Sequence, residues 1–205
     1  MVFRAQSRIG VPVYDTWVNS SVQHDDPVRD DFPLACLRLT DYGQCDRHFR
    51  SQLLDSWTHV REVRFSLVKD DVEVAYIIFD ASHTDMMSWF SQIAIIQSHW
   101  SPDILSDTGL EPVTIQGKCD SFSCRRFLIH GTYGLCRYEY FYTFVIDMAY
   151  DACNTGNQNW EIFNLTSFPV FIYAPGTGRG SLGIDRGTYD LGQEADVLSV
   201  WVKMF

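Results

Sequence analysis

The sequence has no run of about 18 apolar residues, the length that a helix needs to cross the hydrocarbon core of a membrane. It has no block of basic residues longer than Arg125-Arg126, and its formal net charge is −10 at pH 7. Binding to nucleic acid depends on clustered cations, because affinity comes largely from releasing the counterions of the phosphates. We therefore expect neither membrane insertion nor nucleic-acid binding.

Local motifs for metals, dinucleotides and nucleophilic catalysis are also missing. The chain contains no H-E-x-x-H and no Cys-x-x-Cys, so we expect no locally assembled metal site of the zinc type. Gly178 to Gly183 matches G-x-G-x-x-G, but too little chain follows for the helix, the next strand and the acidic residue of a dinucleotide site. Ser181 lacks the glycine two residues before it that a nucleophile elbow requires, because Arg179 stands there. We expect no organic cofactor.

Apolar and aromatic residues are abundant in this chain. Hydrophobic residues make up 46% of its 205 residues and aromatic residues 15%, which excludes general disorder. This length suits one large domain with a substantial core. We expect a single extracellular domain over residues 1–205.

The clearest structural pattern lies between Val60 and Asp80. Two segments, 63–68 and 72–79, alternate with a period of two on either side of Asp70-Asp71, which predicts a hairpin of two β-strands. Asp-Asp is a weaker turn signal than Asn-Gly, so a loop of three or four residues is as acceptable as one of two. The second strand ends apolar on both faces, which indicates a strand in the interior of a sheet or sandwich.

Further short strands are expected along the rest of the chain. We expect a first strand within 2–18, interrupted by Pro12 and therefore at a sheet edge, and a short amphipathic helix within 46–57. Residues 86–93 fit a helix, while 93–96 fit a strand equally well. Other strands are expected at 113–117, 127–129, 138–148, 170–173 and 197–205. The pattern predicts an all-β protein with one or two short helices, an antiparallel β-sandwich or jelly roll stapled by disulfides.

The six cysteines and two glycosylation sequons indicate an oxidising, secreted setting. Sequential pairing, one of fifteen possibilities, predicts the bonds Cys36–Cys45, Cys119–Cys124 and Cys136–Cys153. The sequons begin at Asn19 and Asn164. The alternative is a cytosolic protein with free buried thiols and unused sequons. Residues 1–10 contain no apolar segment of a signal peptide, so a secreted form is expected to be a mature chain or an excised domain.

The strongest candidate for a catalytic site is Asp80, His83 and Asp85, where the second hairpin strand ends. Two carboxylates around an imidazole can hold a divalent ion or orient a general base. The alternative is a polar turn with a helix cap, since strand ends carry polar residues in any case.

Aromatic residues offer a second kind of site, because sugar rings stack on exposed aromatic faces with polar groups around them. The ligand-binding candidates are Trp89, Trp100, Tyr138 and Trp160. The alternative is that such residues belong to the core, which is the commoner role of aromatic residues at strand spacing.

The sequence also contains candidate ligands for calcium. Segment 19–32 carries the carboxylates of Asp25, Asp26, Asp30 and Asp31, which are suitable oxygen ligands. The spacing that arranges such ligands around one ion is missing, so a solvated linker is the alternative.

Three stretches of the chain resemble a domain of secreted marine-invertebrate proteins without an assigned function. They are FRAQSRIGVPVYDTWVN, SQLLDSWTHVREVRFSLVKDDVEVAYIIFDA and ADVLSVWVK. The resemblance implies an extracellular setting and a single domain, and it supplies no site residues.

These observations lead to three hypotheses for the function. The first is a secreted glycoprotein module that binds a glycan or an extracellular protein. The second is a secreted enzyme, a hydrolase or a cofactor-independent oxidising enzyme, with its site near Asp80, His83 and Asp85. The third is an acidic structural protein of the extracellular matrix.

Overall fold

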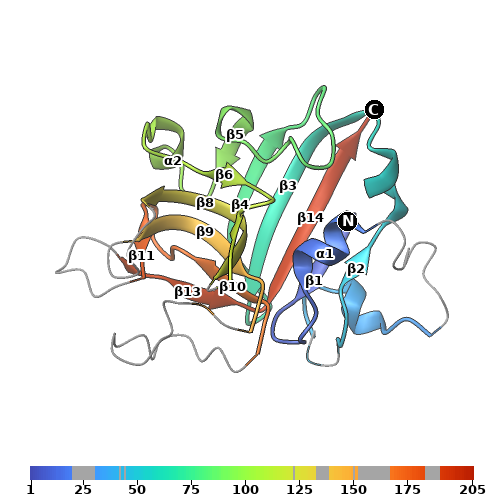
Figure 1. Ribbon diagram of the computed structural model, residues 1–205. Coiled ribbons are helices and arrows are strands. Elements are labelled where there is room, and N and C mark those ends of the chain that lie inside the picture. The colour runs from blue at the N-terminus through green and yellow to red at the C-terminus, as the bar shows by residue number, and fades with distance from the viewer. Residues whose placement is uncertain are drawn as a thin grey trace.

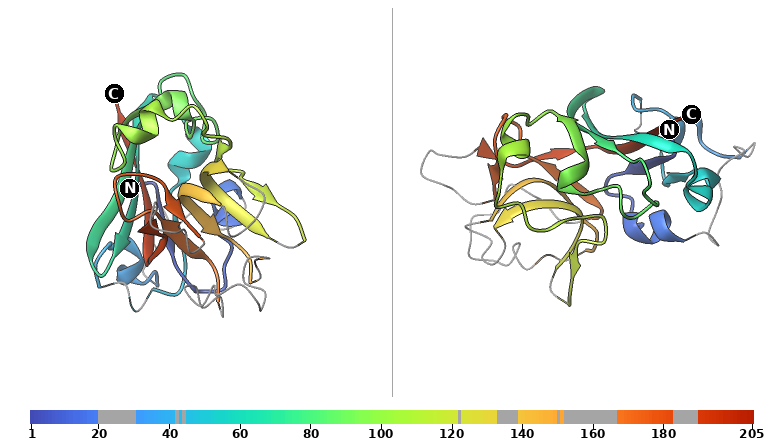
Figure 2. Two further views of the ribbon diagram at one scale, coloured as in Figure 1. Left: turned by 90° about the vertical axis from the view of Figure 1, so that its left-hand side faces the viewer. Right: turned by 90° about the horizontal axis from the view of Figure 1, so that it is seen from above.

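The protein is built from two β-sheets packed face to face, as the computed structural model shows (Figure 1). The structure describes residues 1–19, 31–41, 43, 45–121, 123–132, 139–149, 151, 167–182 and 190–205. In the left view of Figure 2 the strands β3 and β4 (teal) lie on one side, and β8 and β9 (yellow to orange) lie on the other. The predicted all-β, disulfide-stapled sandwich with short helices is confirmed.

The first sheet has six strands within the described residues. Their order is β2 (Phe49–Arg50), β1 (Phe3–Gln6), β14 (Val197–Met204), β3 (Val60–Lys69), β4 (Val72–Asp80) and β5 (Ile95–Ser98). All neighbouring pairs are antiparallel.

The second sheet has eight described strands. Its main order is β12 (Asp190–Leu191), β11 (Gly180–Ser181), β9 (Tyr140–Ile146), β10 (Val170–Tyr173) and β13 (Gln193–Ala195). Strand β8 (Cys124–Thr132) pairs with β9 and also with β6 (Val113–Thr114) and β7 (Lys118–Cys119). The pairs are antiparallel apart from β11 with β12.

The predicted hairpin of β3 and β4 is confirmed, and it lies inside the first sheet. Lys69 pairs with Val72, so the loop consists of Asp70 and Asp71 alone. Both aspartates have positive φ, 48° and 65°, as a two-residue turn that follows the twist of the strands requires. The two-residue alternative is therefore the one that the protein adopts.

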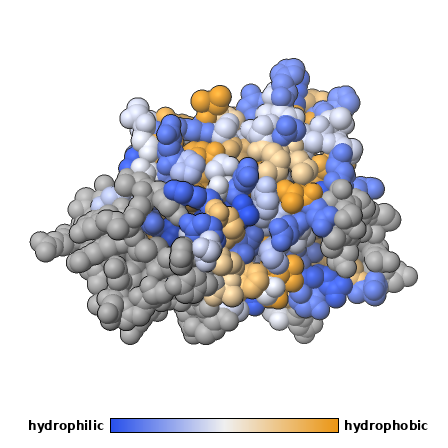
Figure 3. Space-filling model, in the orientation of Figure 1, coloured by the Kyte–Doolittle hydropathy of each residue, from blue (hydrophilic) through white to orange (hydrophobic). Residues whose placement is uncertain are grey.

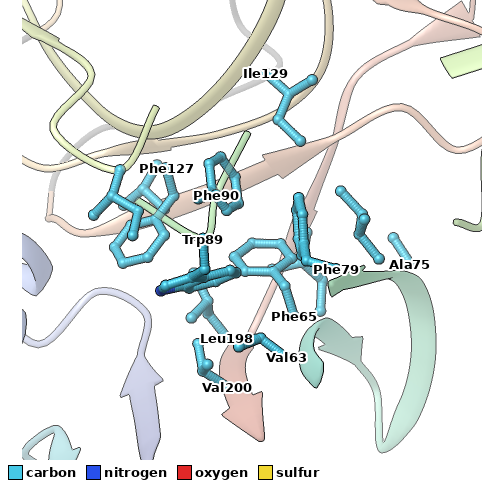
Figure 4. Packing of buried hydrophobic residues seen from close by; sticks show 14 of the residues in the cluster. Val63, Phe65, Ala75, Phe79, Trp89, Phe90, Phe127, Ile129, Leu198 and Val200 are labelled. Atoms are coloured by element: carbon cyan, nitrogen blue, oxygen red, sulfur yellow. The ribbon is translucent and has the colours of Figure 1, made fainter. Parts of the chain in front are cut away.

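The main core fills the space between the sheets. The inward residues of β3, β4 and β14 meet those of the second sheet and of the segment that follows β4, and ten residues of this core are labelled in Figure 4. Aromatic edge-to-face contacts are frequent there, including Phe79 with Trp89 at 5.1 Å between ring centroids. Such pairs add roughly 0.5–1.5 kcal/mol each beyond the burial of their area.

The expected strand over residues 2–18 is only partly correct. Strand β1 covers Phe3–Gln6, but Val13–Val18 forms helix α1, with Val13 and Trp17 buried. The carboxylate of Asp147 accepts hydrogen bonds from the backbone N–H groups of Val13 and Tyr14, at 2.6 and 2.9 Å. These donors would otherwise be unsatisfied at the start of a helix, so a distant carboxylate stabilises a turn that the local sequence does not favour. The expected edge position is wrong too, because β1 pairs with both β2 and β14.

Other short elements depart from their predictions in detail. Segment 46–57 forms strand β2 followed by the 3₁₀ helix η3 (Gln52–Ser56), instead of one amphipathic helix. After residue 86 the sequence leaves a helix and a strand as equal alternatives. The structure has turns there, followed by the 3₁₀ helix η4 (Gln92–Ala94) and strand β5. Two further short helices are η1 (Leu34–Leu37) and α2 (Asp103–Ser106). None of the helices among the described residues has the length and apolar character needed to cross a membrane.

Two of the three predicted disulfides are confirmed. Cys36 bonds to Cys45, and Cys119 bonds to Cys124. Cys136 and Cys153 lie outside the described residues.

Candidate functional site

The predicted catalytic group around His83 forms an exposed turn at the end of β4. The Asp80 carboxylate accepts a hydrogen bond from the Ser82 N–H at 2.9 Å, which is the main reason that the pKa of Asp80 lies below its ordinary value. The Asp85 carboxylate accepts hydrogen bonds from the N–H groups of Met87 and Ser88, both at 2.8 Å, and they lower its pKa in the same way. His83 is exposed and has a φ of 62°.

These contacts are those of the polar turn that stood as the alternative. Among the hydrogen bonds of the described residues, none joins His83 to either aspartate. The part of the chain that the structure describes also holds no group of three or more metal-ligating side chains.

Two of the predicted ligand-binding tryptophans belong to the core, which corrects that prediction. Trp89 and Trp100 are fully buried. Trp89 lies among Phe79, Phe90 and Leu198 (Figure 4), and the Trp100 indole donates a hydrogen bond to the carbonyl of Ala174 at 3.0 Å. Their ring faces pack against protein, so they cannot stack on a ligand.

Several other predicted positions lie wholly or partly outside the described residues. This applies to Trp160, Tyr138, Asn164 and the aspartates 25, 26 and 30. Asp31 is exposed, and Asn19 is half-buried just after helix α1, where its N–H donates to the carbonyl of Asp15. Calcium binding and glycosylation therefore stay predictions.

The structure brings together another set of side chains, on the outer face of the first sheet. Because Val63, Phe65, Leu198 and Val200 point into the main core, the residues that alternate with them point away from the second sheet. We call four of these side chains the outer platform: Arg64 on β3, Tyr76 on β4, Gln97 on β5 and Trp201 on β14. Register places Trp201 opposite Arg64, Arg64 opposite Ile78, and Ile78 opposite Gln97.

Trp201 is the exposed aromatic residue of the platform. Its exposed fraction is 40%, whereas Trp17, Trp89 and Trp100 are fully buried. The indole N–H donates to the hydroxyl of Ser199, two residues earlier on the same face, at 3.1 Å. This bond holds the side chain along β14 and occupies its one polar group. What Trp201 offers a ligand is therefore its apolar ring surface.

Arg64 is held in place beside Trp201 by two neighbours. Its Nε and Nη2 donate to the two oxygens of Glu73, at 3.3 and 2.6 Å. Its guanidinium carbon lies 4.3 Å from the centroid of the Tyr76 ring, a cation–π contact. Ser66 donates a short hydrogen bond to the same carboxylate. Among the described residues Nη1 has no hydrogen-bond partner, and the side chain is 37% exposed.

Gln97 extends the row of polar groups to the edge strand of the described sheet. Its amide Nε2 donates to the hydroxyl of Tyr76 at 2.7 Å, and its side chain is exposed. At the other end of the face Lys203 pairs with Glu62 at 2.8 Å. Polar groups thus lie on all four strands β14, β3, β4 and β5 of this face.

The remaining part of the outer face, over β1 and β2, is covered by the disulfide-bonded residues 31–41 and 45–47. Phe32, Cys36, Cys45 and Phe49 form a small separate core there. Arg4, fully buried, donates to the carbonyl of Arg38 at 2.9 Å, and the N–H of Asp41 donates to Asp71 at the hairpin tip at 3.1 Å. The Cys36–Cys45 bond constrains this covering segment, and the outer platform lies beside it.

A buried ionic cluster on the second sheet is the other concentration of charge. Arg125 forms ion pairs with Glu139 and Asp151, and all three side chains are almost fully buried. The guanidinium also lies 4.8 Å from the ring centroid of Phe144. Burial raises the pKa of Glu139, and burial lowers that of the neighbouring His130 to about 3. Since these groups are enclosed, the cluster connects chain segments and offers a ligand no surface.

The described part of the surface seen in Figure 3 mixes hydrophilic residues with smaller groups of hydrophobic ones. Comparisons with known protein families, curated proteins and solved structures found no significant match to this chain. Any assignment of function therefore rests on the contacts described above.

Proposed function

We propose that this protein is a secreted module that binds a glycan through the outer platform of its first sheet. The observation that carries the proposal is the pairing of Trp201 and Arg64 on neighbouring strands, one offering an exposed ring and the other a fixed hydrogen-bond donor.

The chemistry of a sugar fits this pairing. One face of a pyranose ring carries mainly C–H groups and packs on an aromatic ring, while the hydroxyl groups around it donate and accept hydrogen bonds. Trp201 supplies the apolar surface, and Arg64, Tyr76 and Gln97 supply polar groups at its side. These side chains are fixed by neighbours before binding, which reduces the entropy lost on association.

Secretion is part of the proposal and has separate support. Two disulfide bonds are present, and such bonds persist in oxidising compartments. The sequons at Asn19 and Asn164 and the resemblance to extracellular domains agree with this setting. No contact described above favours the enzyme hypothesis, since the carboxylates of Asp80 and Asp85 are engaged in a turn.

A glycan array tests the proposal with wild-type protein, Trp201→Ala and Leu105→Ala. Leu105 lies on helix α2 and is 47% exposed, so its variant removes a similarly exposed apolar side chain away from the platform. We expect wild type and Leu105→Ala to bind at least one glycan, and Trp201→Ala to bind it at least about tenfold more weakly. Binding that is unchanged in Trp201→Ala would contradict the proposal. Binding to no glycan would also contradict it and would favour an extracellular protein as the partner.

A further inference from the structure

The charges of the outer platform indicate which class of glycan it takes. This inference rests on the function proposed above, and it concerns the distinction between neutral glycans and glycans that carry sulfate or carboxylate groups. Anionic glycans are bound chiefly by unpaired arginine and lysine side chains, because the ionic attraction and the release of counterions supply the affinity.

Two cations of the outer face, Arg64 and Lys203, are each neutralised by a carboxylate. Arg64 donates two hydrogen bonds to Glu73, and Lys203 pairs with Glu62. Asp80, opposite Glu62 on the next strand, carries a further negative charge at the end of the same face, and the nearby Arg61 offsets it. The chain as a whole carries a net charge of −10, so its long-range field repels polyanions.

The groups that remain available are those that recognise hydroxyls. The Nη1 of Arg64 supplies donors, and the Tyr76 hydroxyl, which accepts from Gln97, still has its own proton to donate. The Gln97 side-chain carbonyl supplies an acceptor. A sugar hydroxyl both donates and accepts, so this mixture matches it, whereas a sulfate only accepts and needs donors alone.

We infer that the outer platform is specific for neutral glycans, with the ring of Trp201 against the C–H face of one sugar and Arg64 and Gln97 hydrogen-bonded to its hydroxyls. Glu73 acts as a specificity-determining residue, because its carboxylate positions the Arg64 guanidinium and cancels its charge. Replacing Glu73 by glutamine removes the negative charge and keeps the size of the side chain. The positive charge of Arg64 beside Trp201 is then no longer cancelled.

Matched polysaccharide pairs, such as dextran with dextran sulfate and a neutral galactan with its sulfated form, provide the test. We expect the wild-type protein to bind a neutral member at least about tenfold more tightly than its sulfated form. The affinity for the neutral member should change less than about twofold between 0.05 and 0.5 M NaCl, because few counterions are released. Glu73→Gln should lower the preference for the neutral member by about tenfold or more.

Glu194→Gln is the matched control for that variant. Glu194, on strand β13 of the second sheet, pairs with Arg8 at 2.6 Å, so this change removes a carboxylate from an ion pair away from the platform and should leave the preference unchanged. Tighter binding of the sulfated forms by wild type, or a tenfold loss of affinity with salt, would overturn the inference. If Trp201→Ala abolished such binding, the proposed platform would survive that result and only its neutral specificity would fail. A preference that Glu194→Gln shifts as much as Glu73→Gln would overturn the role of Glu73.

Discussion

Trp201 and Arg64 stand directly opposite each other on the antiparallel strands β14 and β3, with both side chains on the outer face of the first sheet. Opposite residues of such a pair have Cα atoms roughly 5 Å apart. An exposed indole and a guanidinium fixed by Glu73 and Tyr76 therefore form one continuous surface.

Alanine variants of two tryptophans should differ in the free energy of unfolding, because one tryptophan lies in the core and the other on the outer platform. Trp89→Ala removes a fully buried side chain packed against Phe79 and Phe90, so we expect a loss of about 3–5 kcal/mol in the free energy of unfolding. Trp201→Ala removes an exposed side chain, and we expect a loss below about 1 kcal/mol. Urea denaturation of both variants checks this, and equal losses would contradict the assignment of their roles.

The cap of helix α1 should depend on pH through Asp147. Burial raises the pKa of Asp147 from 3.8 to about 6, even though the N–H groups of Tyr14 and Val13 and the nearby Arg126 favour the charged form; Asp15 adds to the rise. Between these two values the folded state binds more protons than the unfolded state. The contribution of this group to the free energy of unfolding therefore grows as the pH falls from about 7 to 4, by about 2–3 kcal/mol.

Asp147→Asn provides the reference for that measurement, because its side chain does not titrate. We expect the stability of wild type minus that of the variant to rise as the pH falls from 7 to 4.5, in denaturant titrations at several pH values. A difference that stays constant, or that falls, would show that burial does not raise the pKa of Asp147 in the folded state.

Alanine variants of Gly117 and Gly10 distinguish the energetic cost of a steric clash from the cost of an unfavourable φ. Both have positive φ, 63° and 74°. A Cβ on Gly117 would lie 1.8 Å from the carbonyl oxygen of Arg125, whereas a Cβ on Gly10 would meet no atom within 4 Å. We expect Gly10→Ala to cost about 1–2 kcal/mol and Gly117→Ala clearly more, as measured by thermal and chemical unfolding. Comparable costs would mean that the chain at Gly117 does not approach β8 as closely as described.

The two disulfide bonds can be checked by peptide mapping and by the loss of stability when one of them is removed. Digestion without reduction should give peptides that link Cys36 to Cys45 and Cys119 to Cys124. Replacing Cys36 and Cys45 together by serine should lower the free energy of unfolding by about 2–3 kcal/mol, because the unfolded chain is no longer constrained. Another partner for Cys36 or Cys45 in the map would contradict the covering segment over β1 and β2.

The sequence predicts the strands of this fold better than its helices or its site. The period of two in β3, β4 and β14 is a local property, and the close spacing of Cys119 and Cys124 is local as well. Helix α1 could not be predicted in this way, because its cap comes from Asp147, far along the chain. The core position of Trp89 likewise depends on contacts with Phe79 and Trp17 that only the folded chain supplies.

The outer platform was missed for a related reason. Alternation along β14 assigns Trp201 to the face opposite Val200, but it does not say which residues lie beside it. Arg64, Tyr76 and Gln97 come from three other strands, and only the register of those strands makes them neighbours. Sequence patterns near Asp80 and His83 were more visible because those residues are adjacent in the chain.

The most direct measurement is a map of backbone amide chemical shifts as a neutral oligosaccharide, selected on the glycan array, is added to the protein. We expect the largest changes at the outer-face positions of β3, β4, β5 and β14, around Arg64, Tyr76, Gln97 and Trp201. Changes confined to the turn at 81–88 or to the second sheet would contradict it.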